Sequence, residues 1–88
     1  MRYTFIPTGI CVTQMRFDID ENAVISNIEF DNGCDGNLKV LAKVLNDKTV
    51  SEIISIGRGN TCGRNPTSCM DQFSIGVEKA AKELGISY

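Results

Sequence analysis

The spacing of apolar residues changes about a third of the way along the chain, and this change restricts the folds that the chain can adopt. Before it, apolar and polar residues alternate as in half-buried strands, so that Met15, Phe17 and Ile19 share one side. After it, apolar residues recur at helical spacing, first at Leu38, Leu41, Ala42 and Leu45. Strands followed by helices predict an α+β fold: a small antiparallel sheet of about three strands followed by three helices packed on one face.

Turn and capping residues mark the ends of these elements. The expected strands are RYTFIPTG, ICVTQMRFDID and VISNIEF, joined in part by the turn DIDENA as a hairpin or meander. Candidate helix caps are Asp35 or Asn37 for the first helix, Thr49 with Glu52 for the second, and Thr67 or Ser68 for the last. The second helix, TVSEIISIG, is rich in β-branched residues, which leaves a strand open as the alternative.

The last segment, TSCMDQFSIGVEKAAKELGISY, predicts the longest helix. Its apolar stripe is Phe73, Val77, Ala80, Ala81 and Leu84, and Gly85 is placed to end it. Asp71 and Gln72 fall in its first turn, where Asp71 suits the helix dipole and can close a capping box with Ser68. We therefore assign Asn37, Ser68, Asp71 and Gln72 to helix capping or to hydrogen-bond support of neighbouring groups.

The length and charge of the chain bound its function. Its 88 residues predict one domain, residues 1–88, with a small core that a metal or a partner subunit would help to stabilise. The net charge of −2 leaves no basic excess for a nucleic-acid partner. The amino-terminal segment lacks a signal-peptide pattern, and no apolar run is long enough for a membrane span. We expect a cytoplasmic protein, in which thiols stay reduced and a metal or catalytic role is favoured over disulfides.

Four cysteines and the absence of histidine define the candidate chemistry. Cys11, Cys34, Cys62 and Cys69 form no CxxC pair, so neither a zinc finger nor a thioredoxin motif is present. Three of them fall in expected turns or at the starts of helices, and the thiols would converge if both helices began at the same end of the sheet. Four thiolates could then hold zinc, iron or an iron–sulfur cluster. Simple packing of free thiols and a redox pair of Cys62 with Cys69 remain open as alternatives.

The glycine-rich loop GRGNTCG is a second candidate site. Its backbone N–H groups, with Arg58, Gly59 and Arg64, could cradle an anion or a nucleotide, although the loop matches neither a P-loop nor GxGxxG. A tight loop that wraps a metal or the helix end is the alternative. Without histidine, no Cys–His or Ser–His pair can form, and we assign no catalytic residue.

The motifs NGCDGN and TCGRNPTSCMDQF together resemble the TSCPD domain family over the segment from Cys11 to Ala81. Met70 stands where the family motif has proline. The family includes small free-standing proteins and the carboxy-terminal domain of adenosylcobalamin-dependent ribonucleotide reductases. The resemblance thus implies an accessory module linked to ribonucleotide reduction and DNA synthesis, with a reductase or another protein as partner. A chain of 88 residues is too short to hold a complete reductase, so we expect no catalysis by the chain alone.

A more distant resemblance is to U-type iron–sulfur cluster scaffolds, in which cysteines occupy positions comparable to those of Cys11, Cys34 and Cys69. The aspartate near the scaffold's first cysteine has no counterpart, and Ser68 replaces the histidine before its last cysteine. The alternatives to a metal-binding accessory module are therefore a cluster scaffold or carrier, a thiol-redox accessory, and a nucleotide-binding domain without metal. An amino-terminal strand at a sheet edge would also permit a homodimer.

Overall fold

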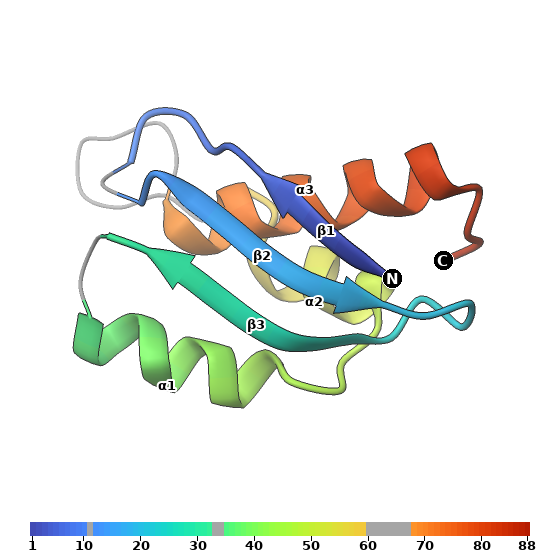
Figure 1. Ribbon diagram of the computed structural model, residues 1–88, viewed down its shortest axis with the longest axis horizontal. Helices are drawn as coiled ribbons and strands as arrows, with labels where there is room; N and C mark the ends of the chain where they lie inside the picture. The colour runs from blue at the N-terminus through green and yellow to red at the C-terminus, as the bar shows by residue number, and fades with distance from the viewer. Residues whose placement is uncertain (11, 33–34, 60–67) are drawn as a thin grey trace.

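Three strands come first in the chain and three helices follow, which confirms the predicted α+β arrangement (Figure 1). The computed structural model describes residues 1–10, 12–32, 35–59 and 68–88. The elements are β1 (Arg2–Phe5), β2 (Gln14–Ile19), β3 (Ile25–Asp31), α1 (Asp35–Leu45), α2 (Val50–Gly57) and α3 (Cys69–Leu84). In Figure 1, α2 and α3 lie behind the sheet, and α1 runs beside β3.

The sheet is an antiparallel meander in the order β1-β2-β3. Its strands are shorter than the sequence predicted, because β1 ends at Phe5 and β2 begins only at Gln14. Pro7 has no N–H to donate and Gly9 has a φ of 71°, so the segment after β1 leaves the strand conformation. Just before β2, Val12 is buried and Thr13 is exposed, so the alternation of β2 does not continue back through these residues.

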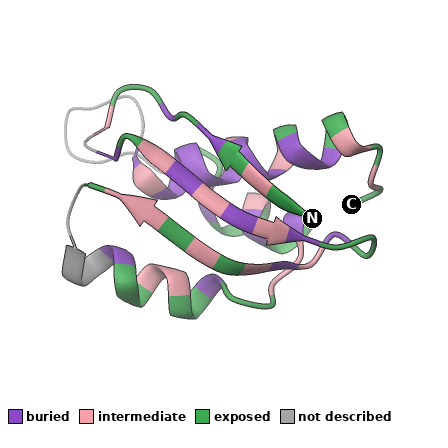
Figure 2. Cartoon of the chain, in the orientation of Figure 1, coloured by how far each residue is buried: buried purple, intermediate pink, exposed green. Residues whose placement is uncertain are grey.

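The core lies between β2 and α3. Met15, Phe17 and Ile19 are buried, which confirms the predicted inner face of β2, and Figure 2 shows buried residues alternating with half-buried ones along this strand. The ring of Phe17 meets that of Phe73 edge-on at 5.5 Å, and the ring of Phe30 also lies 5.5 Å from that of Phe73. The predicted stripe of α3 faces this cluster, with only Leu84 half-buried.

The helix ends follow the predicted signals in two of three cases. Thr49 and Glu52 form the expected capping box at α2, which settles that segment as a helix. Ser68 caps α3, and Gly85 ends it in a left-handed conformation with a φ of 69°. For α1, which begins at Asp35, the described side chains show no cap, so capping by Asp35 or Asn37 stays a prediction. The position before it belongs to Cys34, which lies outside the described residues.

A close approach of β1 to α3 depends on a glycine within the helix. A Cβ added at Gly76 would lie 2.8 Å from Cδ2 and 2.9 Å from Cγ of Phe5, closer than side-chain contacts allow. Gly76 is buried within α3, and Phe5 also lies in the core. The missing side chain of Gly76 thus allows the amino-terminal strand to dock on the longest helix.

We expect Gly76→Ala to destabilise the protein by about 1–3 kcal/mol through overpacking against Phe5. A loss of stability would be informative, because helix propensity alone favours alanine over glycine by about 1 kcal/mol and would make this variant more stable. Urea denaturation of Gly76→Ala, Phe5→Ala and the double variant measures the coupling between the two sites. The destabilisation should largely disappear in the Phe5→Ala background, and a stabilised single variant would contradict the predicted clash.

Candidate functional site

Cys69 is the one predicted metal ligand among the described residues. It is the first residue of α3 and is half-buried, directly after the cap Ser68. Cys11, Cys34 and Cys62 lie outside the described residues. Within the described part of the chain, no three His, Cys, Asp or Glu side chains lie close enough together to hold a metal ion. The four-cysteine site therefore stays a prediction.

Hydrogen bonds tie the described neighbours of these cysteines to one another. Gly59 donates its N–H to Oδ1 of Asp71 at 2.7 Å, which joins the end of α2 to the start of α3. Thr8 donates its N–H to Oε1 of Gln72 at 3.2 Å. In the sheet, Nδ2 of Asn32 donates to Oγ1 of Thr13 at 2.8 Å.

These three contacts lie at one end of the molecule. β1 and β3 end there, β2 begins there, and α1 and α3 begin there, as Figure 1 shows at the left of the view. The described residues nearest in sequence to Cys11, Cys34 and Cys62, together with Cys69 itself, therefore belong to this same end. The chain direction thus agrees with the predicted placement of both helix starts at one end of the sheet.

The first turn of α3 is buried although it is polar. Ser68 accepts the N–H of Asp71 on its Oγ at 3.1 Å, which confirms its predicted capping role. Asp71 and Gln72 are each only 7% exposed. Their acceptor oxygens are used by backbone N–H groups of distant segments, which compensates for the cost of removing these polar groups from water.

Met70, the departure from the TSCPD motif, packs against the end of α2. A Cβ added at Gly57 would lie 2.6 Å from Cε of Met70 and 2.9 Å from its carbonyl oxygen. Gly57 and Met70 are both buried. The start of α3 is thus held against α2 by this contact as well as by the bond from Gly59 to Asp71.

Arg58, one of the predicted anion-binding residues, is directed towards α3. Its Nε donates to Oγ of Ser74 at 3.1 Å, and its Nη2 lies 3.0 Å from Oε1 of Glu78. Gly59, with a φ of 81°, already donates its N–H to Asp71. Arg64 lies outside the described residues. Two of the three predicted anion-binding groups are therefore engaged in contacts that hold α2 against α3.

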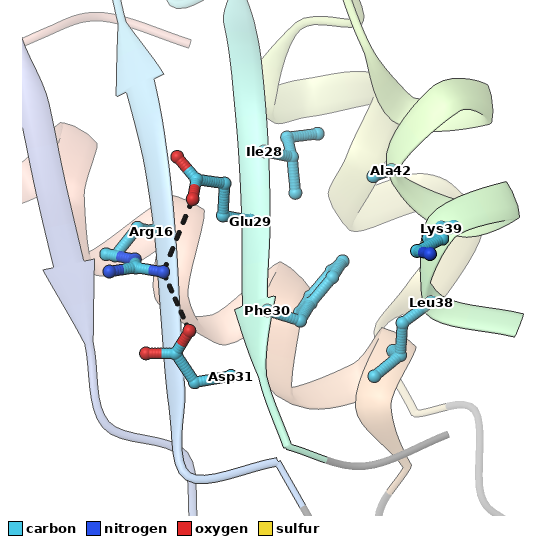
Figure 3. Close-up of a pocket in the computed structure, with 8 residues that line it drawn as sticks. All are labelled: Arg16, Ile28, Glu29, Phe30, Asp31, Leu38, Lys39 and Ala42. Carbon is cyan, nitrogen blue, oxygen red and sulfur yellow. Dashed lines mark hydrogen bonds and ion pairs between the residues drawn. The ribbon is translucent and has the colours of Figure 1, made fainter. Parts of the chain in front are cut away.

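A groove of about 260 Å³ between β3 and α1 is a separate feature of the surface (Figure 3). Its apolar wall includes Phe30 and Leu38, and its polar rim includes Arg16, which bonds to Asp31 at 2.7 Å and to Glu29 at 3.3 Å. The charges around Arg16 are thus paired with one another. The described residues that line the groove include no cysteine.

Comparison with protein families gives a match to the TSCPD domain over residues 1–81. The chain belongs to the TSCPD domain family. The TSCPD domain is associated with ribonucleotide reductases. No curated protein and no solved structure gives a match, so the resemblance to U-type scaffolds stays a prediction. In the described part of this TSCPD domain, no helix is both long and apolar enough to cross a membrane.

Sequence reasoning missed the partners of Asp71, Gln72 and Arg58. The motif placed Asp71 and Gln72 in the first turn of α3, but Gln72 bonds to a residue 64 positions away in the chain. Local periodicity and capping patterns carry no information on contacts at this separation. The pair DQ in the motif TSCMDQ was the available signal, because two adjacent polar residues are unusual at the start of a buried helix.

We expect the ion pair of Arg58 with Glu78 to make stability depend on pH. The hydrogen bond from Arg58, assisted by one from Tyr88, holds the pKa of Glu78 below its ordinary value against the opposing effect of burial. A lowered pKa in the folded state stabilises the protein above the unfolded pKa, and this contribution is lost as the pH falls through the folded pKa.

Glu78→Gln should therefore cost about 0.2–1 kcal/mol at neutral pH, because the pair is partly exposed. The difference from the wild type should shrink as the pH falls from about 5 towards 3, around the ordinary carboxyl pKa. Urea denaturation at several pH values across this range measures the difference in the free energy of unfolding between the two proteins. Glu21→Gln in the exposed turn before β3 is the control for removal of a carboxylate, and a pH-independent difference for Glu78→Gln would contradict the assignment.

Proposed function

We propose that this TSCPD domain holds a metal through Cys11, Cys34, Cys62 and Cys69 and serves as an accessory module to ribonucleotide reductase. The observation that carries the proposal is the set of three hydrogen bonds that joins the neighbours of these cysteines at one end of the molecule. The remaining distances along the chain are short. Gly59 and Thr8 each precede a cysteine by three residues, and three residues of chain span at most about 11 Å.

The donor set suits a closed metal site. Four thiolates give the tetrahedral coordination that structural zinc adopts, and they are equally the ligands of iron–sulfur clusters. A catalytic zinc site usually keeps one position open for water, which a four-cysteine set does not provide. The absence of histidine from the sequence agrees with a site built of sulfur alone.

The family of the domain supports an accessory role. The TSCPD domain is associated with ribonucleotide reductases. A metal held by residues from four separate segments would add stability to a core of this size, since binding to the folded state alone favours folding. We therefore assign the metal a structural role in a domain that acts beside a catalytic partner.

Metal analysis with an absorption spectrum tests the site, on protein purified without oxygen and without a metal-binding tag. We expect one zinc per chain and no visible absorption. Iron with sulfide and a visible band would replace the zinc site with a cluster site on the same thiols and would support a scaffold or carrier. Folded protein with four titratable thiols and no metal would refute both versions of the proposal.

Replacing each cysteine in turn by serine tests whether all four act as ligands. Each variant should lose the metal and several kcal/mol of stability, because a structural metal contributes its binding free energy to folding. Thermal denaturation with and without a chelator gives the metal-dependent part of the stability. An effect confined to Cys62→Ser and Cys69→Ser would indicate a redox pair instead, and four variants with unchanged metal content would contradict the ligand assignment.

A further inference from the structure

The first turn of α3 presents two consecutive polar side chains that reach two different segments of the chain. Oδ1 of Asp71 accepts the N–H of Gly59 at 2.7 Å, and Oε1 of Gln72 accepts the N–H of Thr8 at 3.2 Å. Both side chains are nine-tenths or more buried. Because consecutive helical residues point about 100° apart, a single turn can hold the end of α2 on one side and the segment after β1 on the other.

Both segments lead directly to a predicted ligand. Gly59 stands three residues before Cys62, Thr8 stands three residues before Cys11, and Asp71 follows Cys69 by two. The two hydrogen bonds therefore fix a point three residues before each of two predicted ligands, and they fix both points relative to a third cysteine, Cys69. Both donors are backbone groups, so each bond constrains the path of the chain directly.

We infer that Asp71 and Gln72 are positioning residues for the thiol site, an inference that rests on the metal-binding function proposed above. Neither side chain is a ligand in this scheme. Each holds a backbone N–H so that the following cysteine starts from a fixed place before any metal binds. Groups that hydrogen-bond to a metal ligand itself typically change metal affinity by about 10–100-fold when they are removed, and we expect an effect of this order here.

A purely structural role for the two residues makes a different prediction. If Asp71 and Gln72 only stabilise the fold, their removal lowers stability and leaves the metal affinity of the folded protein unchanged. Glu52 provides a matched control, because its Oε1 accepts the N–H of Thr49 at 3.1 Å in the capping box of α2. That bond also ties a carboxylate to a backbone N–H, but at the opposite end of α2 from Gly59.

The test is a cobalt titration of the full 88-residue chain without oxygen, followed by the thiolate-to-cobalt absorption and by competition with a chelator. We expect Asp71→Ala and Gln72→Ala each to weaken cobalt binding by about 10–100-fold. Asp71→Asn should restore most of the affinity, because its amide oxygen can accept the same N–H. Glu52→Ala should bind cobalt as the wild type does, and urea denaturation of each metal-free chain compares the losses of stability.

Each outcome decides between the two proposals. Absence of cobalt binding by the wild-type chain would overturn the metal site and this inference with it. Wild-type binding together with undiminished affinity in Asp71→Ala and Gln72→Ala would overturn the inference alone. An equal loss in Glu52→Ala would also overturn it, because the effect would then follow stability rather than position. If Asp71→Ala fails to fold, the cobalt affinities of Gln72→Ala and Glu52→Ala are compared instead and test the inference in the same way.

Discussion

The packing of Phe73 between Phe17 and Phe30 is the contact on which the rest of the structure depends. Phe73 is fully buried, and its ring lies 5.5 Å from each of the other two rings. It joins α3 to β2 and β3, two strands that lie far from α3 in the sequence. It also directly follows Gln72, so the same contact that forms the core fixes the rotation of the first turn of α3. Asp71 and Gln72 can reach their backbone partners because the core holds that turn against the sheet.

The hydrophobic core and the candidate site are therefore not independent parts of the molecule. A core of this size has little stability to spare, and a domain of about this length buries only about 60% of the surface that its unfolded chain exposes. Polar side chains buried beside such a core must satisfy their hydrogen bonds, or they would cost more than the core can offset. Asp71 and Gln72 meet this requirement by binding backbone N–H groups of other segments, and they thereby extend the order of the core to the start of the predicted thiol site.

The parts of the fold that the sequence predicted are those governed by local physics. Met15, Phe17 and Ile19 alternate because the two sides of a strand differ in exposure, and Thr49 with Glu52 signals a helix start through bonds within four residues. The end of the first strand was misplaced because Pro7 and Gly9 interrupt an otherwise strand-like composition, and β1 ends at Phe5. The directions of Arg58, Asp71 and Gln72 could not be predicted, because each depends on which helix ends come together after the chain has folded.

Met70 shows how such a contact can replace a family residue. Proline suits the first turn of a helix because its missing N–H has no partner within the helix there. Methionine gives up that conformational advantage, but its flexible side chain packs against Gly57 at a distance that leaves no room for a Cβ. The Met70–Gly57 contact and the Gly59–Asp71 hydrogen bond join the two ends of the segment that carries Cys62. The entropy cost of bringing the ends of that loop together is thus offset by protein contacts that do not involve the predicted thiol ligands.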